Sequence, residues 1–217
     1  MIPAARTQAV IELLGEVEDS LTRKGPPADA LIKSYFAKRR YAGSKDRAAV
    51  TEALYRILRH RGRLAAVLET AGAAITPRLM VLADLVLLAH RSDDEIASLF
   101  STGKFAPDSL GDQENIAVRK MRFVDQDHLP RHARLEYPDW MESMFEARFG
   151  DAFEAELAAM DERAPVTIRA NILKTDRDAL RDRLDGEACV TTHCRYAPQG
   201  LIAEDGKGLT GLKAFRD

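Results

Sequence analysis

The chain has 217 residues, of which 46% are hydrophobic and 30% charged, and a formal net charge of -2. This composition is typical of an ordinary globular protein with one or two domains. It excludes a membrane-spanning protein, because the longest apolar stretch, residues 79–90, contains Asp84 and is far shorter than the roughly 18 to 20 residues that span a bilayer. The chain does not open with a basic leader, so we expect a cytoplasmic protein that binds no membrane.

Helical periodicity dominates the chain up to Arg163. Local signals mark several helix ends: the Gly-Pro-Pro at residues 25–27 stops the first helix, Ser44 is the expected N-cap of the third, and Thr76 precedes a proline that begins the next. Ser92 and Glu95 have the spacing of a capping box. The expected helices cover residues 9–21, 28–40, 46–61, 77–90, 93–100, 114–123, 138–149 and 151–163, with a loop at 101–112.

The periodicity changes after Arg163, where residues 165–173 alternate and are rich in β-branched side chains. This pattern predicts a strand, followed by a helix with Thr175 as its N-cap and by two short strands within residues 188–196 and 200–205. We therefore predict a mainly α fold with three parts: a helical bundle at residues 1–133, an acidic helical connector at 134–163, and a small, incomplete α/β unit at 164–217.

Charge is segregated along this layout. Residues 33–63 contain ten Lys or Arg against two acids, whereas residues 136–162 contain nine acids against one Arg. On a helix, Arg56, Arg59 and Arg63 fall on one side, opposite an apolar stripe. Such a face is often only solvated, but the excess of unpaired cations favours binding to a phosphate backbone. The interleaved aromatic residues can either stack on bases or pack in the core: Tyr35, Phe36, Tyr41 and Tyr55.

Several other residues have ordinary structural interpretations. Trp140 is expected to anchor the acidic helices to a core, and Asp84 lies either at a helix surface or against a capping partner. Cys189 and Cys194 lie five positions apart on an expected strand, and this odd offset places them on opposite faces, so neither a disulfide nor a shared metal is expected. His128 and His132 flank a proline and have no third ligand nearby, which indicates a loop and no metal site.

The order of these segments resembles a known family. AARTQAVIELL, AKRRYAGSKDRAAVTEALYRILRHR, YPDWMESMFEARFG and APVTIRANILK together are similar to the N-terminal portion of the RsmB/Sun/Fmu family of ribosomal RNA cytosine-C5 methyltransferases, over essentially the whole chain. The resemblance implies that the bundle is a NusB-like RNA-binding domain. It also implies that TIRANILK opens the small α/β domain that precedes the catalytic domain in this family.

The family's reaction implies S-adenosylmethionine as cofactor, a cysteine nucleophile that adds to C6 of cytosine, and a second cysteine that assists product release. These groups lie in a Rossmann-like domain that follows the small α/β unit. The glycine cluster at residues 206–211 favours a turn, and the two cysteines lack the proline of the family's motif. We therefore expect a chain truncated before the catalytic domain, with no catalytic, cofactor-binding or metal-binding residues of its own.

The expected partner is ribosomal RNA, bound by a monomer. The candidate RNA-binding residues combine the basic helices with the RAN and LK positions of the small unit: Lys38, Arg39, Arg40, Lys45, Arg56, Arg59, Arg61, Arg63, Arg169, Asn171 and Lys174. One alternative is a stand-alone NusB-like factor in transcription or ribosome assembly, for which the small unit is superfluous. Another is a helical adaptor whose acidic helices bind a basic protein.

Overall fold

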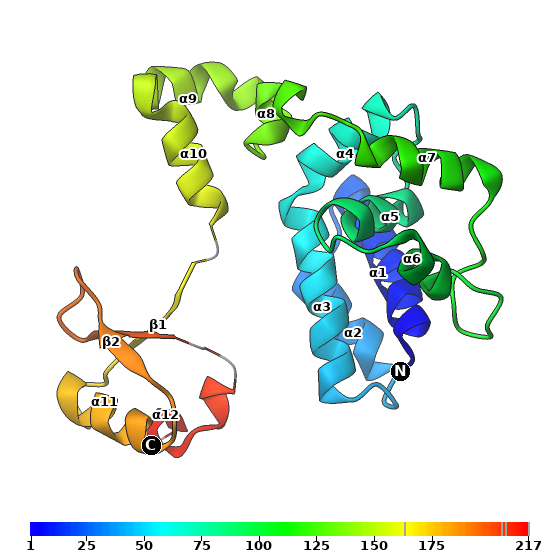
Figure 1. Ribbon diagram of the computed structural model, residues 1–217. Helices are drawn as coiled ribbons and strands as arrows, with labels where there is room; N and C mark the ends of the chain where they lie inside the picture. Colours follow the sequence, from blue (N-terminus) through cyan, green and yellow to red (C-terminus); the bar gives the residue numbers. More distant parts are fainter. Residues whose placement is uncertain (163, 205, 207, 217) are drawn as a thin grey trace. The chain divides into compact units, whose positions relative to one another are not determined.

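A computed structural model describes residues 1–162, 164–204, 206 and 208–216. The chain divides into two compact units, Met1–Asp161 and Glu162–Asp217. The first is helical and the second combines a small sheet with helices, which confirms the predicted fold class (Figure 1). None of the helices in the described part of the chain is long and apolar enough to cross a membrane.

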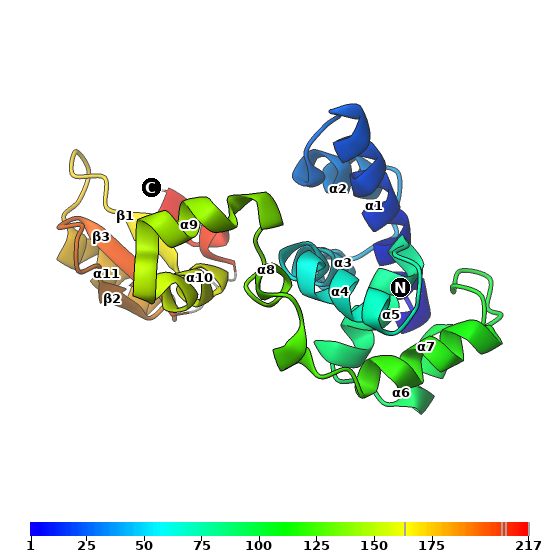
Figure 2. The ribbon, with the colours of Figure 1, turned by 90° about the horizontal axis from the view of Figure 1, so that it is seen from above.

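Seven α-helices of the first unit form a bundle around one core (Figures 1 and 2). They are α1 (Pro3–Arg23), α2 (Ala28–Ala37), α3 (Ser44–Arg59), α4 (Arg61–Thr70), α5 (Pro77–Leu87), α6 (Asp93–Leu99) and α7 (Asp112–Arg122). Helix α1 contacts α2, α3, α5 and α6, so its apolar side lies at the centre of the bundle. The largest fully buried side chains of this core include Leu13, Leu14, Leu54, Ile57, Leu64, Leu68, Met80, Leu82, Ile96 and Met121.

Most predicted helix ends lie close to the observed ones. The Thr76 hydroxyl accepts a hydrogen bond from Leu79 N–H, and Ser92 and Glu95 form the predicted capping box. The N-cap of α3 is Gly43, one residue before the predicted Ser44, because the Asp46 carboxylate accepts the Gly43 N–H at 3.2 Å. Helix α5 ends at Leu87 and not at His90.

The remainder of the first unit is a chain of short helices. They are η1 (Gln126–His128), α8 (Arg131–Arg134), η2 (Asp139–Met141), α9 (Glu142–Phe149), η3 (Gly150–Ala152) and α10 (Phe153–Asp161). Buried Tyr137, Phe153 and Leu157 form a core of their own, and Phe145 packs against it. The predicted anchor, Trp140, is 69% exposed, so that prediction is wrong: the rings of Tyr137, Phe145 and Phe153 contact one another instead, with centroids 5.5 to 6.1 Å apart.

The second unit is built on a three-stranded antiparallel sheet with the order β1-β3-β2. Its elements are β1 (Val166–Arg169), α11 (Arg177–Gly186), β2 (Thr191–His193), β3 (Gly200–Ala203), η4 (Leu209–Gly211) and α12 (Lys213–Arg216). Leu184 and Leu201 are fully buried in its core. The N-cap of α11 is Asp176, whose carboxylate accepts the Ala179 N–H, and not the predicted Thr175.

Candidate nucleic-acid interface

The turn between α2 and α3 carries a group of exposed cations. Helix α2 ends at Ala37, and buried Ala42 fixes the turn because its carbonyl accepts a hydrogen bond from Arg47 Nε at 2.9 Å. Lys38, Arg40 and Lys45 are exposed. No carboxylate pairs with any of these three among the residues that the structure describes. Their charges are therefore available to an anionic partner.

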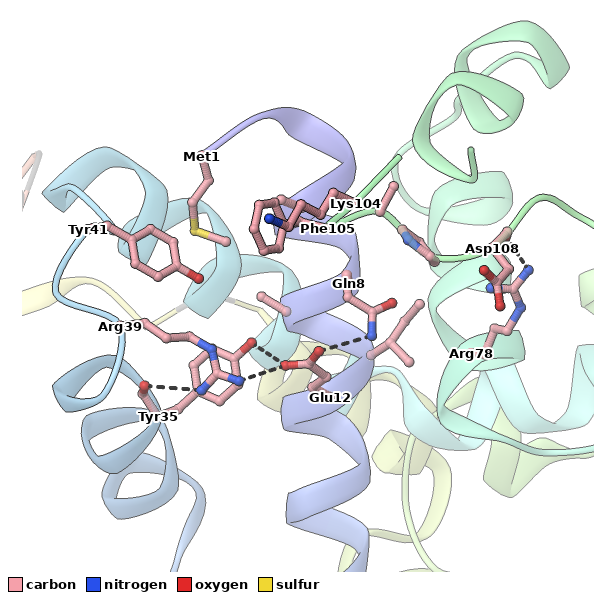
Figure 3. Close-up of a pocket in the computed structure, with 15 residues that line it drawn as sticks. Met1, Gln8, Glu12, Tyr35, Arg39, Tyr41, Arg78, Lys104, Phe105 and Asp108 are labelled. Carbon is pink, nitrogen blue, oxygen red and sulfur yellow. Dashed lines mark hydrogen bonds and ion pairs between the residues drawn. The ribbon is translucent and has the colours of Figure 1, made fainter. Parts of the chain in front are cut away.

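Arg39 belongs to the same turn but is held inside the unit. Its guanidinium lies 3.6 Å from the centroid of the Tyr35 ring and donates a hydrogen bond to Glu12 Oε2 at 3.0 Å (Figure 3). The Tyr35 hydroxyl donates to the same oxygen at 2.6 Å. Burial and this hydrogen bond to Glu12 hold the pKa of Tyr35 well above its ordinary value. Arg39 therefore neutralises Glu12 and is less available than its neighbours.

Arg56 is also committed to an internal partner. Its Nε and Nη2 donate to the two carboxylate oxygens of Asp84 at 2.6 and 2.7 Å, and Asp84 is 1% exposed. This bidentate pair raises the pKa of Arg56. Asp84 thus has the capping partner that the sequence left open, and the exposed residue of the predicted stripe on α3 is Arg59.

The predicted stripe is divided at the end of α3. Helix α3 ends at Arg59 and α4 begins at Arg61, with His60 at the junction. Arg61 lies 3.5 Å from Glu18, and Arg63 lies 3.6 Å from Glu136. The short connection through Gly43 exists, but α3 has 16 residues and is about 24 Å long, which places the two predicted groups at its opposite ends.

In the sequence, Glu136 counts only as one of the nine acids of residues 136–162. In the structure it has a specific role at the start of α4. Its carboxylate accepts the backbone N–H groups of Gly62 and Arg63 at the start of α4, at 2.9 and 3.3 Å. Burial raises the pKa of Glu136 to about 7, although these two amides and the Arg63 charge act in the opposite direction. A Cβ added to Gly62 would lie 3.0 Å from the carboxylate, so this glycine permits the close approach.

The small unit places its three predicted residues along one cavity of about 660 Å³. Arg169 ends β1, and Asn171 and Lys174 follow it in a turn in which Asn171 Oδ1 accepts the Leu173 N–H. Arg183 and Arg216 also line this cavity, and its described lining contains no acid. Sequence reasoning missed these two arginines; for Arg183 the available signal was the amphipathic pattern of residues 177–186, and Arg216 lies outside that helix, in α12.

The described residues contain no group of three His, Cys, Asp or Glu side chains that could hold a metal ion. Cys189 is buried and Cys194 half-buried, and both are free thiols. In the glycine cluster, Gly208 adopts a positive φ of 73° and leads into the short turn η4; residue 207 lies outside the described part of the chain. The described residues 208–211 form a turn, as the sequence predicts.

Two comparisons found similar proteins. Residues 137–208 match the family described as RsmF/B-like methyltransferase, ferredoxin-like domain, which confirms the resemblance for this part of the chain. The crystal structure of PH0851 has the same fold over 99% of this chain, with a TM-score of 0.59 and 18% sequence identity. The chain spans about half of PH0851, 52% of its length. No curated protein matches the chain significantly.

Proposed function

From the match of residues 137–208 to the ferredoxin-like domain of RsmF/B-like methyltransferases, we propose that this chain is the RNA-recognition region of a ribosomal RNA cytosine-C5 methyltransferase. This match is the observation that carries the proposal, because a stand-alone NusB-like factor has no use for such a domain. In the parent enzyme, S-adenosylmethionine supplies the methyl group and is bound by a domain outside these residues. The residues of this chain bind the RNA and hold it in position.

The α2–α3 turn supports RNA binding by the helical unit. Lys38, Arg40 and Lys45 are exposed and have no carboxylate partner among the described residues, so binding a phosphate breaks no internal ion pair. Arg59, at the far end of α3, can take a second stretch of the same backbone. Arg56 and Arg63 support the surface indirectly, because they hold helices together through Asp84 and Glu136.

The small unit supports a second contact. A cavity lined by Arg169, Asn171, Lys174, Arg183 and Arg216, with no acid in its described lining, attracts a phosphate and offers an amide for hydrogen bonding. In this proposal, Arg169, Asn171 and Lys174 contact the part of the RNA that lies next to the catalytic domain of the parent enzyme.

A salt titration with a labelled ribosomal RNA stem-loop tests the proposal. Each phosphate contact releases condensed counterions, so log affinity should fall with log salt by roughly 0.7 to 0.9 per contact. The double variant Lys38→Glu and Arg40→Glu should weaken binding by about tenfold or more at about 0.1 M salt and should flatten the slope by roughly 1.5. Fluorescence anisotropy measures both quantities.

The matched control is the double variant Arg119→Glu and Lys120→Glu on α7. It introduces the same change of charge at exposed positions of α7, a helix that lies away from α2 in both views (Figures 1 and 2). It should retain a much larger share of the affinity. Equal losses in the two variants would mean that only net charge matters and would contradict a specific surface.

A second test concerns the cofactor. We expect titration calorimetry to detect no binding of S-adenosylmethionine to residues 1–217, and we expect Cys194→Ser to leave RNA binding unchanged. Micromolar cofactor binding would place the methyl-transfer chemistry within this chain and would contradict the proposed division of roles.

A further inference from the structure

A cavity of about 630 Å³ opens beside the α2–α3 turn within the helical unit (Figure 3). It lies between α1, the turn that carries Tyr41, and the loop that joins α6 to α7. Ala5 and Ala9 of α1 leave the space open, because they have only methyl side chains. Its volume is within the range of sites that bind small organic groups, roughly 300 to 1,000 Å³.

Two aromatic rings lie exposed at this cavity. Tyr41 is 70% exposed and Phe105 is 62% exposed, and they come from separate loops (Figure 3). The Lys104 ammonium lies 5.5 Å from the centroid of the Phe105 ring. Neither ring belongs to the hydrophobic core of the unit. Exposed aromatic rings next to cations are the groups on which unpaired nucleobases stack.

The inner wall supplies fixed polar groups. Glu12 accepts hydrogen bonds from Gln8 Nε2 on one carboxylate oxygen and from Arg39 and Tyr35 on the other (Figure 3). The Gln8 carbonyl and the edge of the Arg39 guanidinium remain for the hydrogen-bonding edge of a base. Because Arg39 neutralises Glu12, this acid does not repel a nucleotide. The described lining also contains exposed Asp108, together with two further cations, Arg78 and Lys104.

We propose that this cavity receives an unpaired nucleobase of the bound RNA, which stacks on Tyr41 and Phe105. This inference rests on the proposed RNA binding and deepens it, since exposed Arg40 immediately precedes Tyr41 and exposed Lys38 lies three residues before it, within reach of the phosphates that flank the base. The helical unit then selects single-stranded loops in preference to uniform duplex, because only an unpaired base can leave its stack to enter the cavity.

The first experiment uses the unaltered chain. Its affinity is measured by anisotropy for an RNA hairpin and for the same hairpin with abasic loop nucleotides, which keep the phosphates and remove the bases. We expect the abasic hairpin to bind roughly five- to hundredfold more weakly, the range of one base stacked on an aromatic ring, with an unchanged salt slope. Equal affinities would overturn the inference. If the charge reversals at Lys38 and Arg40 still weakened binding, the proposed function would stand without it.

The second experiment removes the rings. The double variant Tyr41→Ala and Phe105→Ala should weaken binding to the intact hairpin by the factor that removal of the bases costs, roughly five- to hundredfold. It should leave binding to the abasic hairpin unchanged. Tyr41→Phe and Phe105→Tyr keep the rings and are the matched controls, with affinities close to that of the unaltered chain. An equal loss on both hairpins would mean that the rings do not contact a base, and would overturn the inference.

Competition with free nucleotides tests whether the cavity binds a base that is part of the RNA or a free nucleotide. Cytidine and adenosine monophosphates at millimolar concentration should compete weakly with the intact hairpin and not with the abasic one. A monophosphate that binds in calorimetry, loses binding in the double aromatic variant and leaves RNA affinity unchanged would identify the cavity as a site for a free nucleotide and overturn the inference. Absence of any salt-dependent RNA binding would overturn both proposals together.

Discussion

Arg56 and Asp84 form an ion pair in which the carboxylate is buried inside the helical bundle. The side chain of Asp84 is 2% exposed, so its charge has no access to solvent that could replace the guanidinium. Arg56→Ala leaves this carboxylate buried without a partner, and we expect a loss of about 3 to 5 kcal/mol in the free energy of unfolding. Urea denaturation measures it.

Arg59→Ala is the matched control for that change. Arg59 is exposed on the last turn of α3, and its truncation should alter the free energy of unfolding by less than about 0.5 kcal/mol. Equal effects of the two truncations would contradict the importance of the buried pair. The contrast also shows why Arg59, and not Arg56, is suitable for a charge reversal in RNA-binding measurements.

Glu136 gives the stability a specific dependence on pH. Burial raises the pKa of Glu136 to about 7 from an ordinary value of 4.5, so between these pH values the folded chain binds a proton that the unfolded chain has released. The contribution of this carboxyl to stability therefore falls as pH rises through that window. We expect the unfolding free energy of the unaltered chain, relative to Glu136→Gln, to fall by an amount of the order of 2 kcal/mol from pH 5 to pH 8.

Urea denaturation of both proteins at several pH values measures this difference. Glutamine keeps an acceptor for the Gly62 and Arg63 amides and does not titrate, so it isolates the charge. A difference that rises with pH would mean that the amides and the Arg63 guanidinium outweigh burial, and the pKa of Glu136 would then lie below its ordinary value.

At the scale of elements, the short helices α9 and α10 depend on an aromatic core and not on Trp140. Phe153 is 1% exposed and contacts both Tyr137 and Phe145. Phe153→Ala should cost about 3 to 5 kcal/mol in the free energy of unfolding, because it leaves a cavity among these rings. Trp140→Ala removes a larger but exposed ring and should cost less than about 0.5 kcal/mol. A larger loss for Trp140→Ala than for Phe153→Ala would mean that Trp140 anchors these helices.

Elements with local signals could be predicted from the sequence. The hydroxyl of Thr76 and the Ser92 and Glu95 pair act on amides within three residues, so their spacing alone identifies two helix starts. Glu136 could not be recognised in this way, because it caps a helix 74 residues earlier in the chain. The partner of Asp84 is likewise 28 residues away. Pairing of this kind depends on tertiary packing, which periodicity does not reveal.

The candidate RNA-binding surface of the helical unit could also be predicted only in part from the sequence. Composition identified the cations of residues 33–63, but their availability depends on acids contributed by other helices. Glu12 and Glu18 of α1 engage Arg39 and Arg61, whereas Lys38 and Arg40 have no such neighbour among the described residues. The cavity at Tyr41 and Phe105 combines α1 with two loops separated by more than sixty positions in sequence, so no motif could have indicated it.

At the scale of the whole molecule, the matched domain and the compact units have different boundaries. The RsmF/B-like match begins at residue 137, within the first unit, and ends at residue 208, within the second. Residues 137–161, which carry the aromatic core of Tyr137 and Phe153, thus belong to the matched domain and to the helical unit at once. Glu136, immediately before this segment, fastens it to α4 through the amides of Gly62 and Arg63.

The two units should unfold in separate steps. The second unit spans only Glu162–Asp217, and domains of about this size bury too little apolar surface to be more than marginally stable. The first unit has a core that draws on eight helices, α1 to α8. We expect differential scanning calorimetry to resolve two transitions, of which the lower belongs to the small unit.

One Leu→Ala truncation in each core shows which unit unfolds in each calorimetric transition. Leu184 and Leu13 are both fully buried, so Leu184→Ala and Leu13→Ala remove the same atoms from the small and the large core. Each change should cost about 2 to 5 kcal/mol in its own unit. Leu184→Ala should lower or abolish only the first transition, and Leu13→Ala should lower only the second, because sites without shared contacts act independently. A single transition that both variants lower equally would mean that the units unfold as one cooperative structure.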